Sequence, residues 1–571
     1  MPPHDWRADY RCAATNSASA AACATARSSH RSCLNRHPHL IYSVVLLKEV
    51  FRSCTGAEKN PRNCFDWPPD VFALSSRLLE ESGLYRRVVS PPQGQKWERW
   101  EREAWQNQVR QAGRKWAELT DQRLRENSKK ILPIEIRRLR DALLKKVNEP
   151  VATLSADWDL MQKVLTLHTI CDEAGTGLGV LSGSGSPVFR QSAARMLHKT
   201  GSLSRFPPQC VRVLPKAWTP QLGIDIRSLS HHLTAVHAEP DVTWTPVVQN
   251  NRNLERLELL LIPWPYQLSA EAFSAHETNV LGTMQTERFG FFKFAPPNEP
   301  PIQEFVKLVK EARSISGEVD MLVLPEAALT EHQLQKLEEA LDEDPDLSNS
   351  KPMILAGVRS DAVWGGFSRN EAIFSYHSPS EDRKRISQPK HHRWTLDESQ
   401  IRDYRLGEQL DPTSHWWEAI ELPERRLNLI ALTNWLLLCP LVCEDLARLE
   451  PVSRTLHAVG PTMVIALLLD GPQLASRWSA RYATVLADDP GSSVLTVTSL
   501  GMVMRSRPPG FEPKPIVALW NDAVGRQREI QLNPSKKGLL LSLEARHKPE
   551  WTADGREDSH VVLTLKGTYE L

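Results

Sequence analysis

Short apolar runs alternate with amphipathic segments through the second half of the chain, from residue 254 to residue 545. The runs have the length of β-strands and carry few charges, so we expect buried sheets. They are Leu257–Pro263, Met321–Leu324, Met353–Val358, Ala372–Tyr376, Trp435–Val442, Met463–Leu469 and Val494–Thr498. Between them, Ile302–Arg313 and His332–Leu341 have the period of helices with one apolar face. This succession predicts an α/β domain.

Three of the predicted strands lead into a chemically reactive side chain. One apolar strand runs into Pro325, which stops its hydrogen-bond ladder and leaves Glu326 at the tip. Lys390 follows a strand and a polar turn, and Cys443 ends a strand at a turn towards a helix. Such a turn aims backbone N–H groups at one point, which suits an oxyanion, and a helix N-terminus makes a thiol more acidic. Taken singly, each residue also fits a structural role: a helix cap, a basic surface loop and a small core residue.

In this chain order, Glu326, Lys390 and Cys443 resemble the Glu–Lys–Cys triad of the nitrilase, or carbon–nitrogen hydrolase, superfamily. Further segments resemble that family's strands and helices in the same order: Met353–Val358, Asn370–Phe374, Gly460–Leu469, Arg477–Ala483 and Val494–Gly501. The resemblance covers residues 254–545, about half of the chain. It implies an α-β-β-α sandwich, and it implies that these domains pair into a homo-oligomer.

The resemblance also implies a chemistry that suits these residue types. Glu326 would be the general base, Cys443 the nucleophile that forms a thioester with an amide or nitrile substrate, and Lys390 the oxyanion stabiliser. This reaction needs neither a metal nor a cofactor. Two alternatives stay open. The fold could be a catalytically silent sensor or effector in a multi-component, for example defence, system, or the thioester could pass to an amine in a soluble acyltransferase.

The residues around the triad depart from the family pattern. Glu444 and Asp445 follow the cysteine, where the family often has an aromatic residue and then aspartate; a Cys-Glu-Asp sequence also occurs in the glutaminase domains of NAD synthetases. No Ser-Gly-Gly-x-Asp-Ser motif follows, so a role in NAD synthesis is not expected.

Other residues are candidates for the surroundings of the triad. Family members have a second glutamate near the site, for which Glu398 and Glu408 compete, with Glu398 preferred. Arg477 and Trp478 are candidates for the substrate pocket, although a surface turn explains them equally well.

The first half of the chain gives fewer signals. Residues 1–40 are rich in Ala, Ser, Arg and His and are expected to be disordered, or to be upstream sequence before the true start. Their Cys and His residues do not have the paired spacing of a zinc site. Residues 41–175 are expected to be helical and could bind a protein partner. Residues 176–253 are expected to be a linker of mixed structure. Its glycine-rich start lacks the Gly-Lys-Ser/Thr ending of a phosphate loop. Residues 546–571 are expected to be a C-terminal extension.

Composition narrows the class of protein. The 571 residues include 70 basic and 69 acidic side chains, a net charge of +1 that gives no reason to expect a nucleic acid or an acidic membrane as partner. The best candidate for a membrane span, Leu427–Val442, is interrupted by Asn428, Asn434 and Pro440 and is better explained as a buried strand. Nine cysteines without a regular framework indicate reduced thiols. A cytoplasmic protein is therefore expected, because no apolar signal segment opens the chain.

Overall fold

The computed structural model describes most of the chain after residue 44. The described residues are 45–55, 61–91, 94, 96–127, 132–154, 156–180, 185–237, 240–247, 255–276, 289–348, 350–360, 367–378, 382–506, 512 and 514–571. The predictions of disorder and of no zinc site for residues 1–40 fall outside these ranges. Within the ranges, no helix is both long enough and apolar enough to cross a bilayer.

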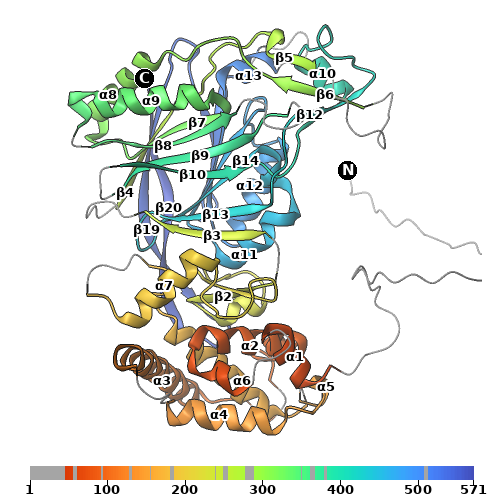
Figure 1. Cartoon of the computed structure of the whole chain (residues 1–571), viewed down its shortest axis with the longest axis vertical. Coiled ribbons are helices and arrows are strands. Elements are labelled where there is room, and N and C mark those ends of the chain that lie inside the picture. The colour runs from red at the N-terminus through yellow and green to blue at the C-terminus, as the bar shows by residue number, and fades with distance from the viewer. Residues whose placement is uncertain are drawn as a thin grey trace, which may run out of the picture. The chain divides into compact units, whose positions relative to one another are not determined.

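Two seven-stranded sheets form the centre of the second half of the chain (Figure 1). The first has the order β10-β9-β8-β7-β4-β19-β20, and its strands are β4 (Arg256–Leu261), β7 (Met321–Thr330), β8 (Met353–Arg359), β9 (Asn370–His377), β10 (Arg383–Pro389), β19 (Leu539–Trp551) and β20 (Glu557–Glu570). The second has the order β18-β17-β16-β15-β14-β13-β3, and its strands are β3 (Asp241–Pro246), β13 (Arg426–Ala431), β14 (Leu437–Val442), β15 (Met463–Leu468), β16 (Ser493–Thr498), β17 (Ile516–Asn521) and β18 (Gln527–Gln531).

The two sheets pack face to face, with β7 against β15 and β16 and with β10 against β13 and β14. Helices cover the outer faces. Helices α8 (Ile302–Ser316) and α9 (Glu331–Glu343) lie on the first sheet, and helices α12 (Trp478–Asp488) and α13 (Leu500–Arg505) lie on the second. The predicted α-β-β-α sandwich is therefore confirmed by the sheet topology and by the packing of these helices.

Alternating side chains of the central strands fill two separate cores. In β4, Leu257, Leu259 and Leu261 point between the sheets, whereas Leu260 packs towards α8. Successive side chains of a strand point to opposite faces, so a strand buried on both faces must be apolar at every position. This is why these strands appear in the sequence as unbroken apolar runs.

The structure differs from the expected boundaries at three places. Leu427–Val442 is not one strand but two antiparallel ones, β13 and β14, because the chain turns between Leu432 and Leu436, whose backbone N–H and C=O groups are 2.9 Å apart. Strand β3, from the expected linker, pairs with β13. Residue 545, the expected end of the domain, lies within β19, and the residues that follow it pair with β20 in the same sheet.

A third, smaller sheet stands beside the sandwich. It has the order β11-β12-β6-β5, with β5 (Phe273–His276), β6 (Phe289–Phe294), β11 (Thr395–Leu396) and β12 (His415–Glu418). Helix α10 (Glu398–Asp403) contacts β11. Strands β6 and β12 pair in parallel, and this pairing places Glu418, the last residue of β12, opposite Phe292 of β6.

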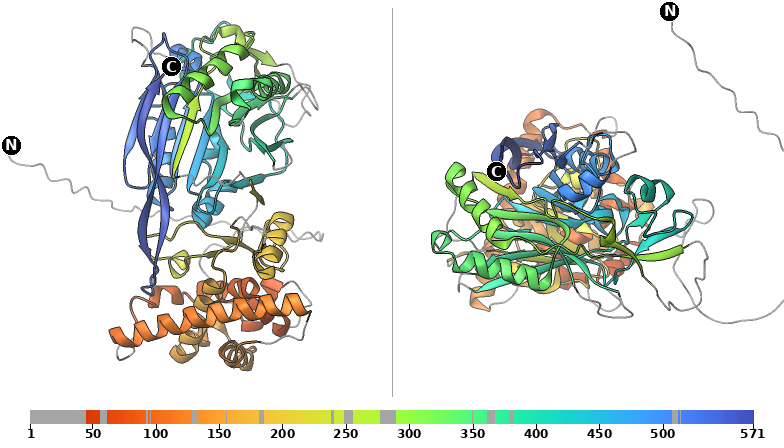
Figure 2. Two further views of the ribbon diagram at one scale, coloured as in Figure 1. Left: turned by 90° about the vertical axis from the view of Figure 1, so that its left-hand side faces the viewer. Right: turned by 90° about the horizontal axis from the view of Figure 1, so that it is seen from above.

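The region before the sandwich is mainly helical, as predicted. Its helices are α1 (Leu47–Thr55), α2 (Pro68–Glu81), α3 (Arg99–Glu126), α4 (Ile134–Lys145), α5 (Val151–Leu154), α6 (Trp158–Ala174) and α7 (Val188–Thr200). A two-stranded ladder of β1 (Arg212–Pro215) and β2 (Leu233–Val236) follows. The β19–β20 hairpin reaches from the sandwich to these helices (Figure 2), where the buried Arg556 guanidinium bonds to Asp172 at 3.1 Å and to Glu173 at 2.6 Å.

Candidate active site

Glu326 is placed by an irregularity in β7. Leu324 pairs with Ala356 of β8, and the next pair is Leu329 with Val358, so residues 325–328 face only Gly357. The chain bulges there, and Ala327 has a φ of 51°, in the left-handed region. This bulge turns Glu326 out of the regular strand while its side chain stays fully buried.

The bulge requires a glycine on the neighbouring strand. A Cβ atom at Gly357 would lie 2.3 Å from the carbonyl oxygen of Pro325, 2.4 Å from Cα of Glu326 and 2.6 Å from the backbone nitrogen of Ala327. All three distances are shorter than van der Waals contact. Gly357 therefore lets β8 approach the segment that holds the glutamate.

Lys390 lies at the end of β10 and is fully buried. Its Nζ donates hydrogen bonds to Oε1 of Glu326 at 2.7 Å and to Oε2 of Glu418 at 2.5 Å. The backbone N–H of Lys390 is held by the carbonyl of Asn370, 3.0 Å away. The lysine thus joins two carboxylates that come from different sheets.

Asn370 and Trp394 complete this cluster. The Nδ2 of Asn370 donates to Glu326 Oε1 at 2.8 Å and to Glu418 Oε1 at 2.7 Å. The backbone N–H of Trp394 donates to Glu418 Oε2 at 3.1 Å. In contrast, the second oxygen of Glu326, Oε2, is buried without a hydrogen-bond partner. One oxygen of this carboxylate is therefore held in place and the other is available.

Cys443 directly follows β14 and starts a single 3₁₀ turn, Cys443–Ala447. Its φ is 46°, a conformation that costs a non-glycine residue roughly 1–3 kcal/mol. The charges of Glu326 and Lys390 both act on the Cys443 thiol, so the fold places the three predicted residues near one another. Only 1% of Cys443 is exposed.

The acidic pair after the cysteine is held by partners on two loops. Asp445 is buried and accepts the backbone N–H of His391 at 2.9 Å, and its Oδ1 lies 2.8 Å from Nδ1 of His392. Glu444 pairs with Arg448 at 2.7 Å. Asp445 therefore connects the loop of the cysteine to the loop of the lysine.

The electrostatics of the cluster follow from its burial. Burial raises the pKa of the Glu326 carboxyl, and Lys390 only partly opposes this because Glu418 adds a second negative charge. Burial alone would lower the pKa of Lys390, but Glu326 and Glu418 outweigh it and hold that pKa well above its usual value. Burial, together with the charge of Glu326, also raises the pKa of the Cys443 thiol. The greater acidity expected from a helix N-terminus is thus wrong: the turn is short, and burial dominates.

The second glutamate is neither of the two candidates from the sequence. The side chain of Glu398 is 66% exposed and pairs with Arg402 on α10, and Glu408 is exposed as well. Glu418, at the end of β12, takes the place beside Lys390. A carboxylate at the end of a predicted strand was the signal that identified Glu326, but β12 is only four residues long and its pairing partner β6 is distant in sequence.

Arg477 and Trp478 both donate hydrogen bonds to the side chain of Asp470. Arg477 Nη2 donates to Asp470 Oδ1 at 2.6 Å, and Trp478 Nε1 donates to Asp470 Oδ2 at 3.0 Å. The charge of Asp470 also acts on Cys443. These two residues therefore hold an aspartate whose charge acts on Cys443. Within the described ranges, no cluster of three or more His, Cys, Asp or Glu residues is arranged to hold a metal ion.

Comparison with known proteins gives matches among solved structures alone, since no family model and no curated protein matches the chain. Nit3 of Saccharomyces cerevisiae, a member of branch 10 of the nitrilase superfamily, is 11% identical; the match covers 48% of this chain and 86% of Nit3, with a TM-score of 0.29. A carbon-nitrogen hydrolase from Helicobacter pylori is also 11% identical, over 54% of this chain and 89% of its own, with a TM-score of 0.27.

The NitFhit protein of C. elegans is 10% identical, over 51% of this chain and 61% of its own, with a TM-score of 0.29. Each match spans about half of the chain.

The close approach at Gly357 leads to a test of how Glu326 is positioned. Gly357→Ala should lower the free energy of unfolding by about 1–3 kcal/mol, the usual cost of overpacking a core. Gly407→Ala is the matched control, because a Cβ there would meet nothing within 4 Å. Urea denaturation measures the free energy of unfolding of both variants. Equal stability of the two variants would contradict the description of the bulge.

Proposed function

We propose that the sandwich is a cysteine-dependent hydrolase of non-peptide C–N bonds, acting on an amide or a nitrile. Cys443 is the nucleophile, Glu326 the general base and acid, and Lys390 the oxyanion stabiliser. The observation that carries this proposal is the free, buried Oε2 of Glu326 in a carboxylate whose charge acts on the Cys443 thiol. Burial raises the pKa of Glu326, so its carboxylate holds a proton more readily than a free glutamate does, as a group that takes up and returns a proton must.

The reaction begins with the transfer of the thiol proton to Oε2 of Glu326. The sulfur attacks the amide carbon, and a tetrahedral intermediate with an oxyanion forms. The C–N bond then breaks, Glu326 returns the proton to the leaving amine, and a thioester remains on Cys443. Water enters, gives a proton to Glu326 and cleaves the thioester to the free acid and the thiol. With a nitrile, the sulfur adds to the C≡N carbon and the nitrogen takes up the proton, which gives a thioimidate. One water then releases ammonia and leaves the thioester, and a second water gives the free acid and the thiol.

Lys390 has the hydrogen-bonding capacity that this role needs. An ammonium group has three N–H donors, and two of them are used by Glu326 and Glu418. The third remains for the oxyanion, together with the backbone N–H of Glu444. Each such donor is typically worth about 3 kcal/mol in the transition state. Because the two carboxylates hold the pKa of Lys390 well above its usual value, its ammonium group keeps this donor at neutral pH.

The direct test is product analysis with the full-length protein. We expect at least one member of a panel of small amides and nitriles to yield free acid and ammonia or amine in equal amounts. Cys443→Ala and Lys390→Met should abolish the reaction. Cys439→Ala should retain it, because this buried cysteine lies on β14 four residues earlier and has no part in the cluster.

Other products divide the alternatives. A new amide in place of the free acid would identify an acyltransferase and contradict hydrolysis. No turnover of any substrate in the panel would contradict an enzyme and favour a catalytically silent module, for which the burial of Cys443 would be the structural reason. A cytoplasmic location, a homo-oligomer and a protein partner for the N-terminal helices remain predictions from the sequence.

A second prediction separates the two glutamates. Glu418→Gln should lower kcat by at least about tenfold, or about 1.4 kcal/mol, because one of the carboxylates that hold the Lys390 ammonium is lost. Glu398→Gln should leave kcat unchanged, because this side chain faces solvent. Steady-state kinetics on the amide that reacts fastest compares them. Equal kcat values for the two variants would contradict a contribution of Glu418 to catalysis.

A further inference from the structure

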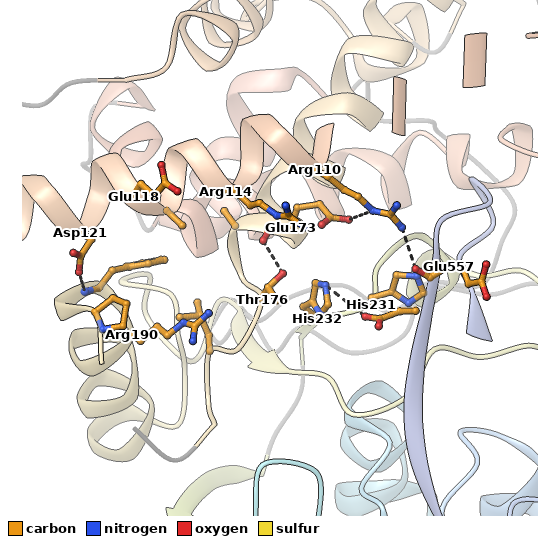
Figure 3. A pocket seen from close by; sticks show the side chains of 16 residues that line it. Arg110, Arg114, Glu118, Asp121, Glu173, Thr176, Arg190, His231, His232 and Glu557 are labelled. Carbon is orange, nitrogen blue, oxygen red and sulfur yellow. Dashed lines mark hydrogen bonds and ion pairs between the residues drawn. The ribbon is translucent and has the colours of Figure 1, made fainter. Parts of the chain in front are cut away.

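A cavity of about 670 Å³ lies apart from the triad and shares no residue with it (Figure 3). It is formed where α3, the end of α6, the start of α7 and the start of β20 meet. Thr176 and Leu178, from the glycine-rich segment expected to be a connector, line it. Its volume is within the range of small-molecule sites, roughly 300–1,000 Å³.

Three arginines line this cavity, and two of them have no partner. Arg110, on α3, donates to the backbone carbonyl of Glu557 at 3.0 Å. Arg114, one turn further on α3, and Arg190, on α7, are exposed and form no ion pair with any described residue. Figure 3 shows Arg110 and Arg114 projecting from α3 and Arg190 projecting from the opposite wall. Guanidinium groups bind carboxylate or phosphate oxygens in pairs, so the cavity offers a site for an anionic group.

The guanidinium of Arg190 lies close to Gly177. Gly177 has a φ of 74°, and a Cβ there would lie 3.1–3.3 Å from the guanidinium atoms of Arg190. The guanidinium therefore packs against the backbone of this turn, and a side chain at position 177 would reduce the space available to it.

The carboxylates of the cavity are of two kinds. Glu173 is bound by Arg556 at 2.6 Å, and Asp121 is bound by Arg125 at 2.7 Å. The side chains of Glu118 and Glu557 form no ion pair with any described residue. Asp558 also lines the cavity, and its Oδ2 lies 3.9 Å from Nε2 of His232. Charged groups of both signs therefore face the cavity, and this disfavours a ligand of high net charge.

The floor of the cavity is rigid. Arg556 is fully buried and also donates to Asp554 at 3.0 Å and to the backbone carbonyl of Leu229 at 2.8 Å. The backbone N–H groups of His231 and His232 both donate to Asp172 at 2.8 Å. The walls from α6, β2 and the β19–β20 hairpin are therefore held in place before any ligand arrives, which reduces the entropy cost of binding.

We propose that this cavity binds a small zwitterionic molecule, an amino acid or a compound of that type. Its carboxylate binds to Arg114 and Arg190, and its ammonium group binds to Glu118 or Glu557. Polyanions such as nucleoside triphosphates are disfavoured because these two glutamates repel them. The inference is independent of the proposed hydrolase activity, because no residue is shared.

Isothermal titration calorimetry on the full-length protein tests the proposal. The probes are the twenty amino acids, each added alone, with pyrophosphate and ATP as polyanions. At least one amino acid should bind with a Kd below 1 mM, about −4 kcal/mol. Arg114→Ala and Arg190→Ala should each raise that Kd by about tenfold or more, the usual effect of losing a hydrogen bond between charged groups.

Arg195→Ala is the matched control, because Arg195 is exposed on α7 but does not line the cavity. It should bind as the unaltered protein does. All three substitutions are at exposed positions, and circular dichroism confirms that each variant is folded. The proposal is overturned if no amino acid binds, if a polyanion binds more tightly than every amino acid, or if the Arg114 and Arg190 variants bind like the control.

Discussion

The candidate site depends on the burial of one lysine. An isolated ammonium group inside a protein costs several kcal/mol, so Lys390 can stay charged only with partners close by. Glu326 and Glu418 supply them at 2.7 Å and 2.5 Å. The two carboxylates in turn share the amide of Asn370, which fixes their orientation. Removing one partner of a buried ion pair costs about 3–5 kcal/mol. The cluster therefore also holds the smaller sheet, which carries Glu418, against the first sheet of the sandwich.

This cluster determines the chemistry that the site can perform. Burial raises the pKa of Glu326, and the negative charge of Glu418 adds to this rise, so a proton is readily held there. Two of the four non-glycine residues with positive φ in the described ranges, Ala327 and Cys443, adjoin this cluster. Both residues lie at the ends of regular strand pairing and beside the cluster. Strained backbone conformations cluster at functional sites, where the surrounding structure holds a side chain in one position at a cost to the stability of the fold.

Much of the fold and three of the site residues could be predicted from the sequence. The strands are apolar throughout because both of their faces are buried, and Glu326, Lys390 and Cys443 come where those strands end. Glu418 could not be predicted, because its position depends on the pairing of β12 with β6, more than a hundred residues earlier. The directions of Glu444 and Asp445 could not be predicted either, because they depend on Arg448 and on the backbone of the lysine loop.

The path of the last residues of the chain could not be predicted from local sequence patterns either. The β19–β20 hairpin has mixed composition near its tip, yet it extends the first sheet and carries Arg556 into the helical region. The burial of that arginine depends on Asp172 and Glu173, almost four hundred residues earlier. Ion pairs between such distant segments leave no periodicity in the sequence.

The most direct measurement of the central claim is the mass of the acyl-enzyme. Glu326→Ala would be mixed with an activated ester, whose leaving group needs no proton, and the intact protein weighed. We predict that the mass of one acyl group accumulates on Cys443, because water is not activated without Glu326. The same experiment with Cys443→Ala should show no adduct. Acylation of another residue, or equal acylation of the Cys443→Ala protein, would contradict the assignment of Cys443 as the nucleophile.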